Sequence, residues 1–377
     1  MSHPGSDQEM APSHASGSRS EKIGSLRPSN PFLKYVMGDI NVLNDWLTDK
    51  PWIVQMPNWI FRGIGAPIFL NNPISGLIIM VAMFISNAWV AINGLLGLVT
   101  AILTALALKQ NRGDIQSGGC TFHGMLIGIV IAATVKPMWY PWVIFETLGL
   151  GIISVYVASG LGTLFGKFNL PALNLPFNLV IFIFLAAVGT NNPHFDTSPP
   201  AANVTSLNWG QIWLAIPNSM GQIYGSMHIA SGFLILLAML VASPITCLHA
   251  ILGSTISIFA AISIAAPPQQ IYDGVWAFNA VLTCASLGGF FYVISIHSFF
   301  VALFAAFFST YVFGAMAKMM AVFHLPAVAF AFNLTTTIFL SVSTSSPSLV
   351  RVPMNEITYA ELHWKVNRNT KVTDISN

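Results

Sequence analysis

Few residues within the apolar segments of this chain could transfer a proton or hold an ion. Glu146 lies between apolar stretches, Asp273 begins another, and His228 and His249 have apolar neighbours. Carriers driven by Na⁺ or H⁺ use paired acids or relays of Asp, Glu and His inside the membrane. The sequence shows no such pair or relay, so it favours passive movement of a neutral solute. It predicts no enzyme, and no catalytic residue, metal site or cofactor.

The composition is that of an integral membrane protein. Of 377 residues, 54% are hydrophobic and 7% are charged. Uncharged runs cover residues 63–108, 197–272, 274–317 and 319–350, and one membrane span needs about 20 apolar residues. Backbone groups in hydrocarbon must bond one another, which predicts an all-α integral membrane protein. The basic residues lie mostly in polar tails, so the net charge of +2 does not indicate a nucleic-acid partner.

The chain repeats itself at a spacing of 156 residues, slipping to 155 near the end of each copy. The matching pairs are Ser75–Gly76 and Ser231–Gly232, Leu96–Gly97 and Leu252–Gly253, Gly118 and Gly274, Leu170–Ala172 and Leu325–Ala327, and Phe177–Leu179 and Phe332–Leu334. Each copy holds five apolar stretches, and an odd number of crossings inverts the second copy. We therefore expect about ten transmembrane helices plus two pore half-helices in two inverted five-helix repeats. Duplicated membrane proteins are typically channels or transporters, with the substrate path between the copies.

The basic residues also orient the chain. Ten of the 15 Lys and Arg residues lie in residues 1–62 or 351–377, and residues 191–213 contain none. The positive-inside rule then places both termini in the cytoplasm and the linker outside, as in a multi-pass plasma-membrane protein. The expected segments are a cytoplasmic tail 1–46, a first repeat 47–190, an extracellular linker 191–213, a second repeat 214–346 and a cytoplasmic tail 347–377. The linker carries the sequon Asn203–Thr205, which predicts a glycan on Asn203.

A short hydrophobic piece interrupted by Gly or Pro opens each copy, at Gly63–Phe69 and Ser219–Gly225. Such pieces at matching places in two halves point to a binding site, because their freed backbone groups are tolerated only in a cavity or buried in protein. The alternative is a pair of tight bends between spans.

Aromatic residues recur at the repeat spacing as well. Phe122 precedes Leu126 by one helical turn, and Phe278 precedes Leu282 in the same way, so each pair shares a helix face. Such a face serves either packing or a pore wall that holds a flat solute. The residues that follow each Phe, His123 and Asn279, are aligned polar partners.

Several motifs resemble the vertebrate urea transporters, solute carrier family 14. They are NPISGL at 72–77, LP at 170–171 with LPFN at 175–178, GQIYG at 221–225, CLHA at 247–250 and WAFN at 276–279. The resemblance runs from about residue 47 to 359. It implies a homotrimer in the lipid bilayer, a narrow pore in each protomer, and facilitated diffusion of urea or a similar small neutral solute.

The resemblance also implies a set of pore-lining positions. In the family, a Gln begins each pore half-helix, Phe residues form slots at both ends, and a Thr from each half lines the constriction. The corresponding residues here are Ala66, Phe69, Phe122, Leu126 and Asn174 in the first copy, and Gln222, Ile223, Phe278, Leu282 and Ala329 in the second.

Three of these positions, and the residue after Phe122, depart from the family pattern. Ala66 stands in place of the first Gln, Asn174 and Ala329 in place of the two Thr, and His123 in place of an Asn. Three accounts are open: urea transport with altered kinetics, a shifted solute preference, or a non-conducting paralogue that acts as a membrane assembly subunit.

Overall fold

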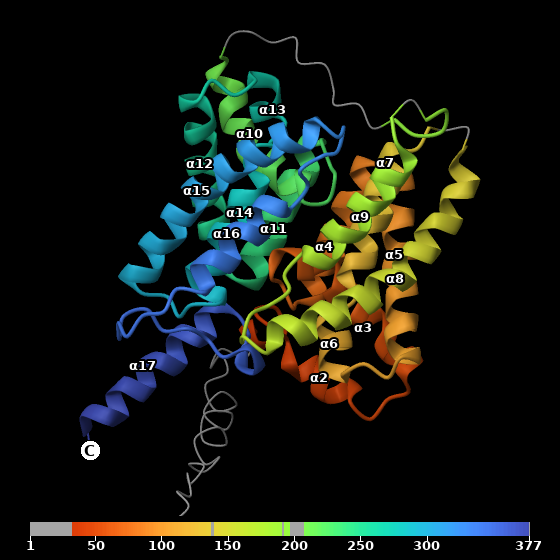
Figure 1. The fold of residues 1–377 in the computed structure, drawn as a ribbon. Coiled ribbons are helices and arrows are strands. Elements are labelled where there is room, and N and C mark those ends of the chain that lie inside the picture. The colour runs from red at the N-terminus through yellow and green to blue at the C-terminus, as the bar shows by residue number, and fades with distance from the viewer. Residues whose placement is uncertain (1–31, 137–138, 191, 197–206, 377) are drawn as a thin grey trace, which may run out of the picture.

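The computed structural model describes residues 32–136, 139–190, 192–196 and 207–376, with side chains described up to residue 369. The helices form two bundles that lie side by side (Figure 1). The first bundle contains η1 (Leu33–Tyr35), α2 (Asn41–Leu47), α3 (Trp52–Gly65), η2 (Ala66–Ile68), α4 (Pro73–Ser86), α5 (Ala88–Ala107), α6 (Arg112–Ser117), α7 (Phe122–Thr134), α8 (Tyr140–Gly166) and α9 (Leu175–Val188).

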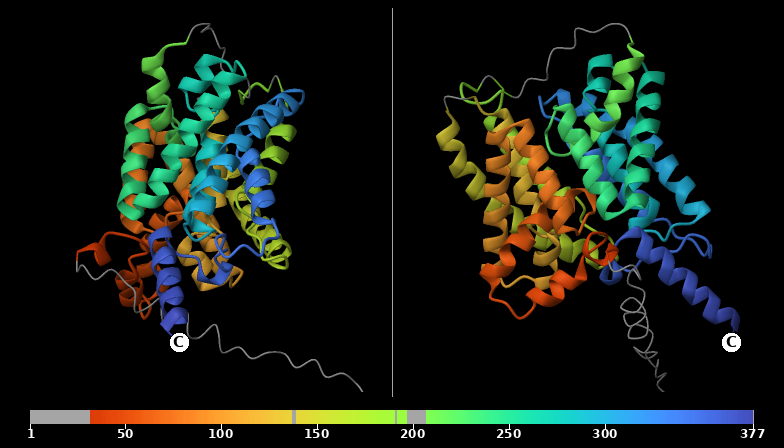
Figure 2. Two further views of the ribbon diagram at one scale, coloured as in Figure 1. Left: turned by 90° about the vertical axis from the view of Figure 1, so that its left-hand side faces the viewer. Right: turned by 180° about the vertical axis from the view of Figure 1, so that it is seen from behind.

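The second bundle follows the same order of elements. It contains α10 (Trp209–Gln222), α11 (Ile229–Ala242), α12 (Pro244–Ser263), α13 (Pro268–Tyr272), α14 (Phe278–Ala285), η4 (Ser286–Phe290), α15 (Ile296–Ala321) and α16 (Phe330–Leu340), and is followed by η5 (Met354–Glu356) and α17 (Ala360–Ser376). Helices α2 and α17 lie at one end of the molecule, called here the terminal end, and α13 and the start of α10 lie at the opposite linker end (Figures 1 and 2).

The helix boundaries confirm the internal repeat. Helices α11 and α12 begin and end 156 residues after α4 and α5, and α14 begins 156 residues after α7. Backbone turns recur too, because residues with positive φ occupy matching places in both copies. The pairs are Phe69 and Gly225, Lys109 and Ala265, Gly118 and Gly274, Asn169 and His324, and Leu173 and Val328. The two sequences therefore encode one backbone path twice.

Polar caps fix where the helices begin. The Asn72 side chain accepts a hydrogen bond from the Ser75 N–H at 3.0 Å, and its amide also donates to the carbonyls of Val36 and Gly38 at 2.8 Å each. Pro73 then occupies the first helical position, where its missing N–H leaves no bond unmade. One asparagine thus begins α4 and anchors the chain that precedes the first repeat.

The two bundles meet where α4 packs antiparallel to α11. The Ser75 hydroxyl, near the start of α4, donates to the Ala238 carbonyl near the end of α11 at 2.7 Å. The Ser231 hydroxyl, near the start of α11, donates to the Ala82 carbonyl near the end of α4 at the same distance. Reciprocal contacts of this kind define a two-fold relation. Because α4 and α11 run in opposite directions, the two-fold axis that relates them is perpendicular to the helices, as inverted repeats require.

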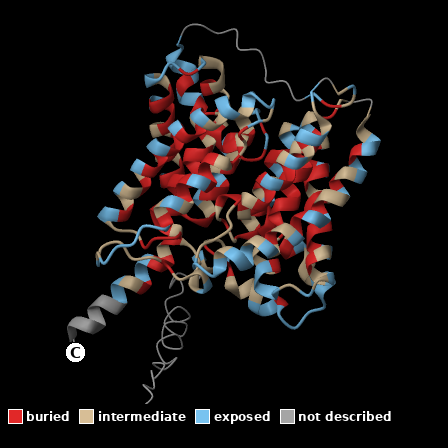
Figure 3. Cartoon of the chain, viewed as in Figure 1, coloured by how far each residue is buried: buried red, intermediate tan, exposed pale blue. Residues whose placement is uncertain are grey.

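All ten predicted apolar stretches are helical, although not all are long. Within the described part of the chain, five helical segments are long and apolar enough to cross a membrane, and α3 with η2 and α4 forms a broken pair bent by 77°. The other apolar segments, α9, α11, α14 with η4, and α16, are shorter. The count of ten crossings remains a prediction. Buried residues face the bundle interiors (Figure 3), and exposed apolar side chains such as Phe145, Ile183 and Phe304 cover outer faces, as a lipid environment requires.

A close helix contact in the first bundle gives a stability prediction. A Cβ added to Gly76 would lie 1.8 Å from the Phe61 carbonyl oxygen, so α3 and α4 would have to separate. We expect Gly76→Ala to destabilise the protein by about 1–3 kcal/mol and to lower its thermal unfolding temperature in detergent. The control is Gly149→Ala in α8, where an added Cβ meets nothing within 4 Å. Equal unfolding temperatures for the two variants would contradict this contact.

Candidate functional site

Two equivalent chain reversals lie at the repeat interface. Ala66 follows the last residue of α3, and Phe69 then adopts a left-handed conformation with φ 64°. Gln222 is the last residue of α10, and Gly225 has the same φ. The resemblance implied a Gln at the start of a half-helix, whereas these positions close α3 and α10. Their side chains therefore approach the path from the carboxyl end of each short helix.

Glycines make these reversals possible. The Leu70 N–H donates to the Gly65 carbonyl at 3.1 Å, and the Ser226 N–H donates to the Gly221 carbonyl at 3.0 Å. A Cβ on Gly65 would lie 2.4 Å from the Leu70 oxygen, and one on Gly221 would lie 2.7 Å from the Ser226 oxygen. The backbone bond that closes each turn leaves no room for a side chain. Each of these hydrogen bonds pairs a backbone N–H with a carbonyl that would otherwise lack a partner inside the membrane.

A large open cavity of about 1000 Å³ enters the first bundle from the terminal end. Four of the predicted solute-path residues line it, namely Ala66, Phe69, Phe122 and Asn174. His123 lines it as well, and residues of the segment between α16 and α17 close its outer wall. Its described lining does not include Leu126 or any of the five predicted residues of the second copy. The cavity therefore covers one half of the predicted path.

Aromatic rings narrow the inner end of the cavity. The Phe69 ring lies 4.9 Å from that of Phe290, 6.1 Å from Phe291 and 6.0 Å from Phe332, measured between centroids. These three rings come from the second bundle, so the narrowing forms only where the copies meet. The rings are tilted or edge-on and in contact with one another, so they form an apolar aromatic wall that offers no ligand to a hydrated ion.

The remaining predicted residues lie within the same hydrophobic core. Leu126, Ile223, Leu282 and Ala329 are all buried, and Phe278 packs against that core. The Phe278 ring lies 6.1 Å from the Phe313 ring in an edge-on arrangement.

The Gln222 amide donates to the Asp273 carbonyl at 2.8 Å. This bond uses one of its donors and leaves the side-chain oxygen to accept an N–H.

Two asparagines that our site prediction omitted hold the turns before α9 and α16. The Asn333 side-chain oxygen accepts from the Asn174 N–H at 2.9 Å, and its amide donates to the Ala329 carbonyl at 3.0 Å. Asn279 accepts from the Phe332 N–H at 2.9 Å and donates to the Val328 carbonyl at 3.1 Å. The sequence did contain a signal for this role. The motif around Asn178 recurs around Asn333, and a polar residue that recurs within two apolar segments requires a hydrogen-bond partner.

One buried charged pair lies beside the cavity mouth. Arg62 is fully buried; its Nε donates to the Asn58 side chain at 3.0 Å, and its Nη1 donates to the carbonyl and side-chain oxygens of Asn71. Asp39 lines the same mouth, and burial raises the pKa of its carboxyl to about 6, with the Arg62 charge opposing the shift. Asp39 is therefore a group in this mouth that can titrate close to neutral pH.

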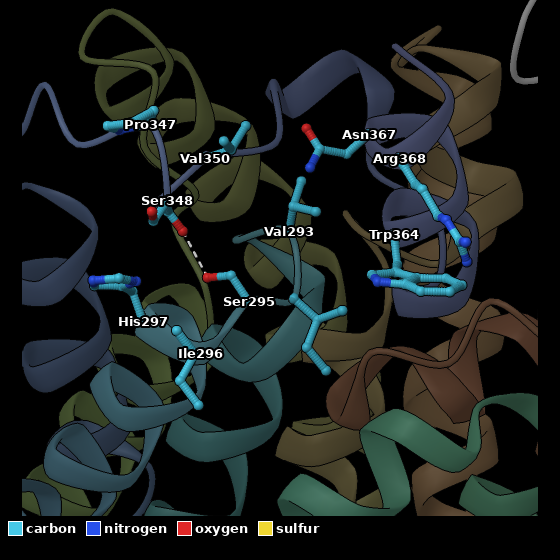
Figure 4. Close-up of a pocket in the computed structure, with 11 residues that line it drawn as sticks. Val293, Ser295, Ile296, His297, Pro347, Ser348, Val350, Trp364, Asn367 and Arg368 are labelled. Carbon is cyan, nitrogen blue, oxygen red and sulfur yellow. Dashed lines mark hydrogen bonds between the residues drawn. The ribbon is translucent and has the colours of Figure 1, made fainter. Parts of the chain in front are cut away.

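A second cavity of about 310 Å³ lies between the start of α15 and α17 (Figure 4). The Ser295 hydroxyl donates to the Ser348 carbonyl at 2.6 Å across its floor, and the Arg368 guanidinium lies 5.4 Å from the Trp364 ring centroid at its edge. Its described lining includes none of the ten predicted solute-path residues. Of these two cavities, only the larger one is lined by predicted solute-path residues.

Comparisons with known proteins cover the same region. The sequence model of the urea transporter family matches residues 57–344. Urea transporter 1 of Mus musculus is 37% identical over 337 residues, which is 87% of this chain and 88% of that protein. Urea transporter 1 of Rattus norvegicus and that of Capra hircus are each 36% identical over the same length and shares.

The cavity opens at the terminal end, so we expect a water-soluble reagent to reach its lining residues from that side of the membrane only. Ser117 lines the cavity, so Ser117→Cys in a Cys120→Ser background should react with a small membrane-impermeant thiol reagent. The reaction should occur only from the side that carries the C-terminus, as compared in inside-out and right-side-out vesicles. The background variant alone is the control, because its remaining thiols, Cys247 and Cys284, are buried. Labelling of the Ser117→Cys variant from the opposite side would contradict the placement of the cavity.

Proposed function

This chain belongs to the urea transporter family, and on that premise we propose that it moves urea, or a closely similar neutral solute, passively across the plasma membrane. The observation that carries the proposal is the cavity at the repeat interface, which ends at the rings around Phe69. An aromatic wall of this kind suits a planar neutral solute better than a hydrated ion. The names of these relatives favour a transporter over a non-conducting assembly subunit.

We propose that the path continues from the cavity through the second copy. Its terminal half would be lined by Ala66, Phe69, Phe122, Leu126 and Asn174, and its linker half by Gln222, Ile223, Phe278, Leu282 and Ala329. In the structure Ile223, Leu282 and Ala329 are buried and Phe278 is partly buried, so passage would require side chains such as Phe278 to change rotamer. Such movements take place within nanoseconds in exposed residues and more slowly in packed ones.

The assembly and orientation of the protein are further parts of the proposal. We propose a homotrimer with a separate path in each protomer, both termini in the cytoplasm, and a glycan on Asn203 outside the cell. Both described ends of the chain lie at the terminal end (Figure 1), which supports placing the termini on one side. Asn203 itself lies outside the described residues.

The direct test is uptake of labelled urea in cells that express the chain, compared with cells carrying an empty vector. Passive movement predicts that urea equilibrates without accumulating, whatever gradient of Na⁺ or H⁺ or membrane voltage is applied. Moving one elementary charge through the field changes the free energy by about 2.3 kcal/mol per 100 mV, so any coupled charge would produce accumulation. Titration of Asp39 near pH 6 can change the rate of flux but not its end point. Uphill accumulation would overturn the passive proposal.

The departures from the family pattern predict slow urea flux. Each hydrogen bond that a solute loses without replacement costs about 1–3 kcal/mol, and Ala66 and Ala329 offer no side-chain oxygen. Replacing both, as Ala66→Gln with Ala329→Thr, should raise urea flux about tenfold for each 1.4 kcal/mol regained at the barrier. It should also reduce passage of methylated ureas relative to urea. Uptake per protein at the cell surface is the measurement, and no gain in urea flux would refute the explanation.

A further inference from the structure

The two copies use equivalent buried polar groups differently. In the second copy, Asn279 bonds to the Val328 carbonyl and the Phe332 N–H at the start of α16. Asn333 bonds to the Ala329 carbonyl and to the Asn174 N–H of the first copy. Their equivalents in the first copy are His123 and Asn178. Among the described residues, His123 Nδ1 has no hydrogen-bond partner, and neither has either polar atom of the Asn178 amide. The first copy thus retains hydrogen-bonding capacity that the equivalent residues of the second copy use on backbone groups.

His123 and Asn178 lie on neighbouring helices beside the cavity. His123 lines the cavity and is 2% exposed, and Asn174, which also lines it, is 4% exposed. Asn178 lies one helical turn beyond Asn174, because its N–H donates to the Asn174 carbonyl at 3.0 Å. Helices α7 and α9, which carry His123 and Asn178, pack against each other. His123 is therefore at the cavity wall, and the Asn178 amide lies one helical turn beyond the lining residue Asn174.

Enclosed polar atoms need a partner, since leaving them unpaired is costly. The partner here is either ordered water or the solute itself. The Asn178 amide offers two donors and one acceptor, and Nδ1 of His123 donates or accepts according to its tautomer. A small solute with a carbonyl and several N–H groups complements this set. It would also meet, in the same cavity, an Ala66 methyl where the family pattern has a Gln.

We propose that His123 and Asn178 form a solute subsite that selects small neutral amides of the urea class by hydrogen bonds to both the carbonyl and the N–H groups. The subsite rests on the proposed function and adds two specificity-determining residues to it. His123 on α7 and Asn178 on α9 would supply the solute with hydrogen bonds that Ala66 does not provide.

The decisive variant is His123→Asn, which gives the first copy the residue that the second copy carries. By equivalence with Asn279, the new side chain should bond to the Leu173 carbonyl and the Phe177 N–H. We therefore expect a higher thermal unfolding temperature together with about tenfold lower urea flux per surface protein, the effect of one lost hydrogen bond. The flux ratio of urea to N,N′-dimethylurea should fall as well, because the methylated solute relies less on these groups. A purely structural role for His123 would not produce higher stability and lower flux together.

Asn178→Leu is the second variant, and it should lower the same flux ratio. Asn93→Leu is the matched control, since the Asn93 side-chain oxygen is also enclosed and unpartnered but lies on α5 away from the cavity lining. Unchanged flux ratios in both His123→Asn and Asn178→Leu would show that the groups bind only water and would overturn the subsite. If the unmodified chain carries no urea above the empty vector, the proposed function itself fails instead.

Discussion

The antiparallel contact of α4 with α11 is the constraint on which the rest of the structure depends. Ser75 and Ser231 each donate to a backbone carbonyl of the opposite helix, and Gly76 and Gly232 let α3 and α10 approach the same helices closely. Hydroxyl-to-carbonyl bonds and small residues are the means by which helices associate within lipid, where the hydrophobic effect between them is absent. This contact sets the two-fold relation, and that relation brings Phe69 of one copy against Phe332 of the other.

Local pattern was sufficient to predict the helices and their duplication, because apolar runs and repeated glycines are visible in a single stretch of sequence. It was not sufficient for the hydrogen bond between Asn333 and the Asn174 backbone, since those residues are 159 positions apart. The resemblance also put a Gln at the start of each half-helix, whereas Ala66 and Gln222 lie at the carboxyl ends of α3 and α10. A residue type alone does not fix the helix direction, which depends on turns such as the one that Ser226 closes with Gly221.

The two copies share a backbone path but differ in how their equivalent buried polar side chains are bonded. Where the second copy has Asn279, which bonds to two backbone groups, the first has His123 with an unpartnered nitrogen. The open cavity also belongs to the first copy, while the equivalent residues of the second are packed. Duplication thus supplied a symmetric frame, and substitution at a few buried polar positions made its two ends chemically different.

The shortness of α9 and α16 bears on how far a solute must travel without water. At 1.5 Å per residue, the 11 residues of α16 extend about 16 Å and the 14 residues of α9 about 21 Å, against a hydrocarbon thickness of about 30 Å. Both helices are therefore shorter than the bilayer is thick. If the proposed path runs between them, a solute entering from the terminal cavity would be without water over only part of the membrane thickness, and few hydrogen-bonding groups would then be enough to guide it.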